Sequence, residues 1–142
     1  MYLVEESEYI SGLVNMASSV SKYMGCSFMD ATCFKKKDFL NSFSYFYNID
    51  KKDIKIHETS ITLEEFIKNY FGDNKELIDG LSFWISLKTG DLVHIYELDD
   101  DCKLCDLLSN SGYGKTPFYC VDYVIIIEFK KMTIAFIVGN NE

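Results

Sequence analysis

The amino-acid sequence predicts an α+β domain, with N-terminal helices packed on an antiparallel sheet that is built from C-terminal hairpins. Apolar residues in the first half recur at helical spacing, whereas the second half contains strand-like runs joined by short turns. No alternation of strands with crossover helices is apparent. Because the chain has 142 residues, of which 48% are hydrophobic, we expect a single domain over residues 1–142.

Two helices are predicted in the first fifty residues. The first begins with Ser7 as its cap and runs to about Met24, and Gly25 suits the position after its end. The second runs from residue 36 to residue 47, although its aromatic content would also suit a strand. Their apolar positions are Ile10, Leu13, Val14, Ala17 and Val20 in the first helix, and Phe39, Leu40, Phe43, Phe46 and Tyr47 in the second.

The middle of the chain contains a short alternating strand at 53–57 and the start of a third helix. Thr62 and Glu65 have the spacing of a capping box, in which each side chain accepts a hydrogen bond from the backbone amide of the other residue. The helix is expected to end at Gly72. Its inward-facing residues should be Leu63, Phe66, Ile67 and Tyr70.

After Gly80 the pattern becomes that of strands. Residues 81–87 and 91–98 are predicted to form a hairpin around 88–90, followed by a short helix at 103–108 that Asp100 or Asp101 caps. Residues 117–129 and 132–138 are predicted to form a second hairpin around 130–131. Since the run 124–127 is apolar on both faces of the pleat, its strand should be central and covered on both sides.

The net charge of the chain is concentrated in its middle third. From His57 to Asp106 the sequence has twelve carboxylates and four lysines, which accounts for the whole net charge of −8. A surface charged in this way repels phosphate backbones and attracts basic proteins. All 14 cationic residues are lysine, so the chain lacks the arginine fork that best recognises phosphate. The sequence therefore favours a basic protein partner and disfavours nucleic acid.

The chain carries no recognisable targeting or membrane segment. Residues 1–6 contain acids where a signal peptide needs basic residues, and the longest apolar run, 121–129, is too short for a bilayer. An odd number of cysteines favours reduced thiols over a disulfide scaffold. They are Cys26, Cys33, Cys102, Cys105 and Cys120. We expect a cytoplasmic protein without membrane association, monomeric when no partner is bound.

Two motifs suggest ligands but are incomplete. The segment 111–116 ends like a phosphate-binding loop, yet Ser109 stands where that loop needs glycine and Pro117 where it needs a helix. Cys102 and Cys105 have the spacing of half a zinc site or of a thiol redox pair, which Cys120 and a histidine would have to complete. We interpret the first as an ordinary glycine-rich loop and the second as incidental thiols, with metal and redox sites as alternatives.

Catalytic groups are scarce. The only histidines are His57 and His94, and His94 should share a strand face with Leu92 and Tyr96, which favours a structural role. The sequence contains no serine elbow, and its carboxylates cluster in exposed turns and helix faces. The acidic turn 97–101 resembles the start of a calcium loop but lacks its glycine, so a solvated turn, a docking patch and a cation site stay open. We expect no enzymatic activity, cofactor or bound metal.

Trp84 is the only tryptophan of the chain. If residues 81–87 form a strand, Trp84 shares a face with Ser82 and Ser86. It is then either buried under a helix or an aromatic anchor on a polar sheet face. Anchors of this kind are enriched in the hot spots of protein interfaces.

These general features resemble those of immunity proteins of bacterial toxin systems, including contact-dependent growth inhibition. The resemblance covers the size, the acidity, a composition rich in Lys, Ile and Asn, helices followed by hairpins, and the lack of catalytic motifs. It implies that the protein binds and neutralises one cognate basic toxin, often a nuclease with a basic active-site cleft. The carboxylates of this chain would occupy that cleft in place of phosphates.

The immunity hypothesis assigns a set of partner-binding residues. The leading contacts are the acids of the turn: Glu97, Asp99, Asp100 and Asp101. The secondary contacts are Glu64, Glu65, Asp73, Glu76 and Asp79, with Trp84 as the anchor. Two alternatives remain: a small metal- or thiol-dependent enzyme or sensor that uses Cys102, Cys105 and Cys120, and a structural protein that self-associates through an exposed sheet edge.

Overall fold

A computed structural model describes residues 2–20, 27–110 and 120–140. Within them lie five helices: α1 (Val4–Val20), α2 (Phe39–Tyr47), α3 (Leu63–Phe71), α4 (Lys75–Thr89) and α5 (Leu104–Asn110), together with one 3₁₀ turn, η1 (Lys51–Asp53). The strands are β1 (Ser27–Phe34), β2 (Ile56–Thr59), β3 (Leu92–Leu98), β4 (Cys120–Phe129) and β5 (Thr133–Asn140). They form one sheet in the order β1-β5-β4-β3-β2, with every neighbouring pair antiparallel. The predicted α+β fold is confirmed.

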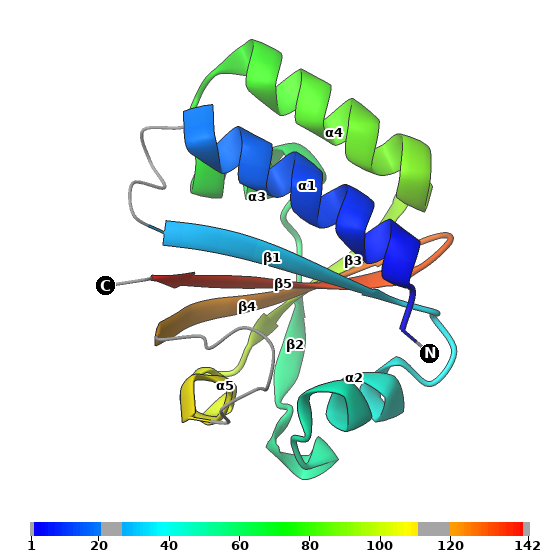
Figure 1. Cartoon of the computed structure of the whole chain (residues 1–142), viewed down its shortest axis with the longest axis vertical. Helices are drawn as coiled ribbons and strands as arrows, with labels where there is room; N and C mark the ends of the chain where they lie inside the picture. The colour runs from blue at the N-terminus through cyan, green and yellow to red at the C-terminus, as the bar shows by residue number, and fades with distance from the viewer. Residues whose placement is uncertain (1, 21–26, 111–119, 141–142) are drawn as a thin grey trace.

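The sheet is covered by helices on both faces. Helices α1, α3 and α4 lie on one face and α2 and α5 on the other, so the molecule has three layers (Figure 1). The molecule has one hydrophobic core on each face of the sheet, and alternate residues of β4 belong to the two cores. Ile125 and Ile127 belong to the core under α1, α3 and α4, whereas Val124 and Ile126 belong to the core with α2 and α5. The prediction that this strand is central and covered on both sides is confirmed.

Helix α1 also covers one edge of the sheet. The Ser7 hydroxyl accepts a hydrogen bond from the Cys33 N–H at 2.7 Å, and the Ser11 hydroxyl bonds both the N–H and the C=O of Ala31 at 3.0 and 2.8 Å. The backbone N–H of Leu3 donates to the Cys33 carbonyl. These bonds occupy backbone groups that an edge strand leaves open to association with another chain. The opposite edge is the four-residue β2.

The start of the chain differs from the prediction in two ways. Helix α1 begins at Val4, and Ser7 lies inside it, so the prediction that Ser7 caps the helix is wrong. Its hydroxyl serves β1 instead, a strand that was not predicted. Met24 and Gly25, where the first helix was expected to end, lie outside the described residues.

The largest correction concerns residues 81–87. They belong to helix α4, so neither the strand nor the hairpin around 88–90 exists. The Asn74 side chain caps α4 by accepting from the Leu77 N–H, and Leu81 and Ile85 are buried one turn apart. The β-branched and aromatic residues of this segment favour a strand locally, but burial of the helical stripe outweighs that preference.

Smaller differences concern the ends of elements. Helix α2 begins at Phe39, after Asp38 in a left-handed conformation (φ 59°). Residues 51–53 form η1, and the adjacent strand is displaced to Ile56–Thr59. Helix α5 begins at Leu104, so neither Asp100 nor Asp101 is its cap.

Several other predictions are correct. The capping box of Thr62 and Glu65 is present with both hydrogen bonds, and α3 ends before Gly72. The β4–β5 hairpin turns at Lys130 and Lys131, although residues 117–119 of its predicted first strand lie outside the described part of the chain. Among the helices that the structure describes, none has the length and apolar character needed to cross a membrane.

Candidate functional site

The predicted contact residues separate into two groups in the fold. Glu64, Glu65, Asp73, Glu76 and Asp79 lie on or between α3 and α4, whereas Glu97, Asp99, Asp100 and Asp101 lie at the end of β3 and in the turn that follows it. Two acids of each group already have a lysine or histidine partner inside the molecule. The groups differ in their surroundings, because the α3–α4 group shares α4 with large exposed apolar side chains.

The turn group takes part in a local ion-pair network. Asp99 Oδ1 lies 2.7 Å from His57 Nδ1, and Asp101 Oδ2 lies 3.1 Å from Lys55 Nζ. The hydrogen bond and the charge of Lys55 lower the pKa of Asp101. Asp99 and Asp101 connect the turn to β2 and to the segment before it, so half of the leading contact set already has a partner inside the molecule.

Glu97 faces a separate hollow of about 300 Å³ that Tyr70 and Tyr123 also line. Burial, and next to it the negative charge of Glu97, raises the pKa of the Tyr70 hydroxyl. Asp100 is exposed in the turn and has no ion pair among the described residues. The four acids of this group therefore do not form one unneutralised patch.

The helical layer made of α1, α3 and α4 carries a net charge of its own. These three helices contain seven carboxylates and three lysines, a balance of −4. On the opposite layer, α2, η1 and α5 contain two carboxylates and two lysines, which balance to zero. The fold thus places an acidic helical surface on one side of the sheet.

Some carboxylates of the α3–α4 group have neighbours on the same surface. Asp79 pairs with Lys75 at 2.8 Å, and Asp73 with Lys68 at 3.5 Å. Glu64 accepts a hydrogen bond from Ser82 at 3.2 Å, which joins α3 to α4. Exposed pairs of this kind contribute little to stability and exchange readily for a partner's charges.

Glu76 differs from its neighbours on α3 and α4. It is exposed, and within the described residues it forms no hydrogen bond or ion pair. Its carboxylate is therefore available to a cation of a partner.

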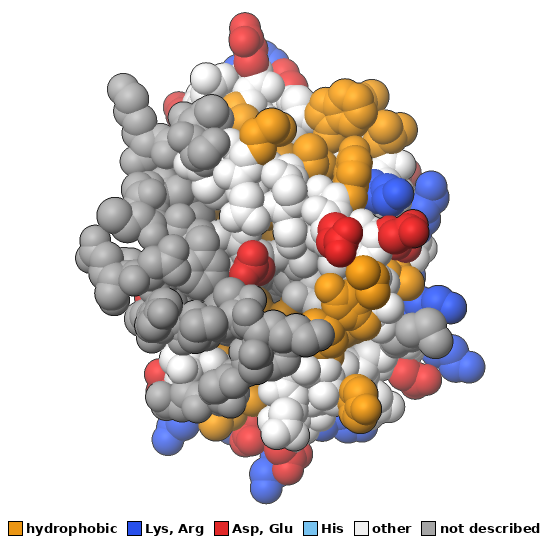
Figure 2. Space-filling view, in the orientation of Figure 1, with side chains coloured by type: hydrophobic (Ala, Val, Ile, Leu, Met, Phe, Trp, Pro, Cys, Tyr) orange, Lys and Arg blue, Asp and Glu red, His pale blue; other side chains and the backbone are white. Residues whose placement is uncertain are grey.

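An exposed apolar patch lies on the same layer. It consists of Phe83, Trp84 and Leu87 of α4, whose exposed fractions are 58%, 49% and 58%. These residues face away from the buried stripe of α4, and Figure 2 shows hydrophobic side chains gathered over this helix. The prediction that Trp84 shares a strand face with Ser82 and Ser86 is wrong, because the segment is helical. Large apolar side chains exposed next to one another are typical of interaction surfaces.

Next to the apolar patch, a groove runs between α1 and α4, which lie side by side (Figure 1). Its volume is about 290 Å³, and its walls are almost entirely apolar. The lining residues are Leu13, Met16 and Ala17 of α1, and Glu76, Leu77, Gly80, Leu81 and Trp84 of α4. We call this feature the α1–α4 groove.

Gly80 lies in the middle of α4 and borders the groove. A β-carbon at this position would meet no atom within 4 Å, so packing does not require glycine there. Glycine inside a helix costs about 0.5–1 kcal/mol relative to alanine. At this position the wall of the groove therefore has no side chain, at that cost in helix stability.

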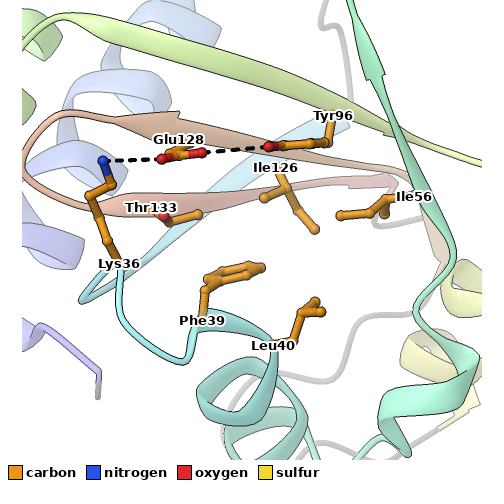
Figure 3. Close-up of a pocket in the computed structure, with 8 residues that line it drawn as sticks. All are labelled: Lys36, Phe39, Leu40, Ile56, Tyr96, Ile126, Glu128 and Thr133. Atoms are coloured by element: carbon orange, nitrogen blue, oxygen red, sulfur yellow. Dashed lines mark hydrogen bonds and ion pairs between the residues drawn. The ribbon is translucent and has the colours of Figure 1, made fainter.

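A second cavity lies on the other face of the sheet, between the start of α2 and strands β2–β5 (Figure 3). Its volume is about 320 Å³. Phe39 and Leu40 face Ile56 and Ile126 across it, and the polar groups gather at one end. There Glu128 accepts from Lys36 Nζ at 3.0 Å and, at 3.5 Å, from the Tyr96 hydroxyl.

The polar end of this cavity continues along β2 and β3. His94 Nδ1 lies 2.5 Å from Glu58 Oε1, and Tyr96 lies beside both. Burial, together with the charges of Glu128 and Glu58, raises the pKa of the Tyr96 hydroxyl. Each of these polar side chains thus has a partner within the cluster, and the structural role of His94 stays a prediction. Sequence reasoning did not find this cluster, because its members come from four separate segments.

The thiols of Cys102 and Cys105 donate to different carbonyl groups. Cys102 Sγ donates to the Asp53 carbonyl and Cys105 Sγ to the Asp122 carbonyl. Among the side chains that the structure describes, no three His, Cys, Asp or Glu residues come together in a way that could hold a metal ion. The side chain of Cys120, the third member of that hypothesis, lies outside this set, as does the glycine-rich segment 111–116.

Comparisons with known proteins return no relatives. No family model, curated protein or solved structure matches the chain. The candidate surface therefore has to be interpreted from its own chemistry.

Proposed function

We propose that this protein binds and neutralises a basic toxin protein, as an immunity protein does, and that the surface of α3 and α4 makes the central contacts. The single observation that carries the proposal is the apolar patch of Phe83, Trp84 and Leu87, exposed within an acidic helical layer. Interfaces of high affinity combine large apolar or aromatic anchors with a polar, charged surround. This layer has both components.

The charge of the whole molecule supports fast capture of such a partner. A net charge of −8 attracts a basic surface over distances beyond direct contact and accelerates association. A toxin that acts on nucleic acid has a cationic cleft, and the carboxylates of α3 and α4 would occupy it in place of phosphates. Anchors that lose contact with water, here Trp84 and its neighbours, then slow dissociation.

The two groups of predicted contacts receive different roles in this proposal. The α3–α4 group, with Glu64, Glu76, Asp79 and Trp84, forms the centre of the interface. Glu65 and Asp73 lie beside it, and the turn acids Glu97, Asp99, Asp100 and Asp101 act as an outer ring that steers the partner. We favour this order because the exposed apolar patch of Phe83, Trp84 and Leu87 lies on α4, beside the first group.

The experiment compares two charge reversals of equal size against the protein encoded beside this gene, tested for toxicity and for binding. One variant carries Glu64→Lys, Glu76→Lys and Asp79→Lys, and the matched control carries Asp99→Lys, Asp100→Lys and Asp101→Lys. We expect the first to weaken binding ~100-fold or more and to abolish protection, whereas the second mainly slows association and reduces its dependence on salt, by ~10-fold or less.

Two results would contradict the proposal. If the unmodified protein neither binds nor neutralises that toxin, the immunity function is wrong. If the two variants bind equally well, or the control loses more affinity, the placement of the interface on α3 and α4 is wrong. Circular dichroism of both variants establishes that each is folded.

A further inference from the structure

We infer that the α1–α4 groove binds an amphipathic basic helix that the partner presents, so that α1 and α4 become two walls of a three-helix contact. This inference rests on the proposed function and specifies which kind of segment the partner contributes. It uses the shape of the groove, the exposure of its rim and the charges beside it.

The shape of the groove suits a helix. Leu77, Gly80 and Trp84 line it at intervals of three and four residues, which places them along one side of α4. From Leu77 to Trp84 the helix rises about 10 Å, or two turns. A helix lying in this groove would meet the same spacing with its own residues at i, i+3 or i+4 and i+7.

Small side chains allow a close approach. Ala17 on α1 and Gly80 on α4 both border the groove, and a β-carbon at Gly80 would project into open space. Packed helices have axes about 8–10 Å apart, and small contact residues allow the shorter distances. Neither the packing of α4 nor its backbone conformation requires glycine at position 80. The structural consequence of glycine here is a deeper groove.

The rim of the groove is apolar and exposed. Met16 is 62% exposed on the α1 side and Trp84 is 49% exposed on the α4 side. Long apolar side chains on both rims would remain in contact with water unless another chain covered them. A bound helix would bury both at once.

The charges beside the groove select the sign of the occupant. Glu76 lines it, is exposed and forms no ion pair among the described residues. Of the lysines of this pair of helices, Lys75 bonds Asp79, and Lys88 lies 5.3 Å from the centre of the Tyr9 ring. An apolar helix flanked by lysine or arginine would therefore meet the unpaired Glu76 carboxylate in a helical layer with a balance of −4, whereas an acidic helix would be repelled.

Trp84 provides a direct test, because the only tryptophan of the chain lies in the groove wall. The probe is a synthetic peptide of about 14 residues, four helical turns, made of leucine and lysine in an amphipathic pattern and without tryptophan. The matched peptide replaces each lysine with glutamate. We expect the lysine peptide to shift the emission of Trp84 to the blue in a saturable manner that weakens with salt, and the glutamate peptide to leave it unchanged.

Two glycine variants locate the peptide. Gly80→Leu fills the groove and should reduce the affinity for the lysine peptide at least tenfold. Gly12→Leu is the matched control, since Gly12 is an exposed α1 position where a β-carbon also meets no atom within 4 Å, and it does not line the groove. This control should bind like the unmodified protein. Thermal melting of both variants establishes that they are folded.

Each remaining outcome would overturn the inference. Equal binding by Gly80→Leu and the unmodified protein would place the peptide elsewhere, and equal binding of the glutamate peptide would remove the charge selection. The absence of any shift in Trp84 emission with the lysine peptide would show that no basic helix enters the groove. A shift of Trp84 that depends on protein concentration alone would identify a second copy of this chain as the occupant.

The failure of this inference can be separated from failure of the proposed function. If Gly80→Leu still neutralises the cognate toxin fully while the α3–α4 charge reversal does not, the toxin binds the acidic surface without using the groove. If the unmodified protein does not bind the toxin but does bind the lysine peptide through the groove, the proposed function fails and the groove remains a site for basic helices.

Discussion

Replacing Ser7 by alanine sets two physical effects against each other. In a helix interior, alanine is favoured over serine by about 0.5 kcal/mol, so helix propensity alone predicts a more stable protein. The structure predicts the opposite. The Ser7 side chain is part of the joint between α1 and β1, because its hydroxyl accepts from the Cys33 N–H at 2.7 Å and donates to the Leu3 carbonyl at 2.6 Å.

The magnitude follows from the burial of these groups. Ser7 is 3% exposed, so water cannot easily replace the lost hydroxyl at the Cys33 amide. A buried donor left without an acceptor costs about 1–3 kcal/mol. After subtracting the gain in helix propensity, we expect Ser7→Ala to lower the free energy of unfolding by about 0.5–2.5 kcal/mol, which corresponds to a fall of about 2–8 °C in Tm for a chain of this size.

Ser18→Ala is the matched control on the same helix. The Ser18 hydroxyl donates to the Val14 carbonyl within α1 and reaches no strand, so propensity should dominate and stability should stay equal or rise slightly. Urea unfolding followed by circular dichroism measures both variants. If Ser7→Ala proves as stable as the unmodified protein, the bonds between α1 and the edge of β1 do not hold this joint together, and the argument fails.

Three further predictions concern local features of the fold. Thr62→Ala removes the capping box of α3 and should lower the free energy of unfolding by about 1 kcal/mol in urea titrations; an unchanged midpoint would contradict the role of the cap. Burial raises the pKa of the Cys33 thiol to about 12, so little reactive thiolate should form at neutral pH. After brief treatment of the folded protein with iodoacetamide, mass spectrometry should find Cys33 unmodified. Modification as fast as in the unfolded protein would contradict the burial of this thiol. Burial also raises the pKa of the Asp30 carboxyl group, so the folded state binds the carboxyl proton more tightly than the unfolded state does. The stability that this proton provides is lost as the pH rises through the folded pKa. Asp30→Asn should therefore raise the free energy of unfolding at neutral pH, and this gain over the unmodified protein should disappear in acid. If the two proteins differ in stability by the same amount at every pH, the proposed effect of Asp30 is refuted.

Parts of the fold could be predicted because their signals are local. The capping box of Thr62 and Glu65 involves residues three apart, so the sequence alone contains both partners. The run 124–127 is apolar at consecutive positions, which only a strand covered on both faces can bury completely. The hairpin at Lys130 and Lys131 is similar, since its two strands are neighbours in the chain.

Other parts could not be predicted, because distant segments decide them. Phe83, Trp84 and Ile85 are residues that favour strands, yet α1, α3 and the sheet bury one helical stripe of this segment. Strand β1 contains Asp30 and lacks clear alternation, and it forms by pairing with β5, more than one hundred residues later in the chain. Its outer edge depends in turn on Ser7 and Ser11 of α1.

The candidate site also has features that the sequence shows and features that only the fold shows. The excess of acids between His57 and Asp106, the lack of arginine and the single tryptophan are properties of the sequence, and they already favour a basic protein partner. The sequence does not show which of these acids have a partner in the folded molecule. Asp99 lies 42 residues from His57, and only the β2–β3 pairing brings them to 2.7 Å.

What the sequence by itself determined is therefore the sign of the charge, the class of the fold and the elements whose signals lie within a few residues. The tertiary structure alone decided that Trp84 lies on a helix, that α1 and α4 enclose an apolar groove, and that the helical layer around it carries uncompensated carboxylates. The reason is physical. Charge and local hydrogen bonding depend on composition and nearest neighbours, whereas exposure depends on which surfaces distant segments cover when they pack.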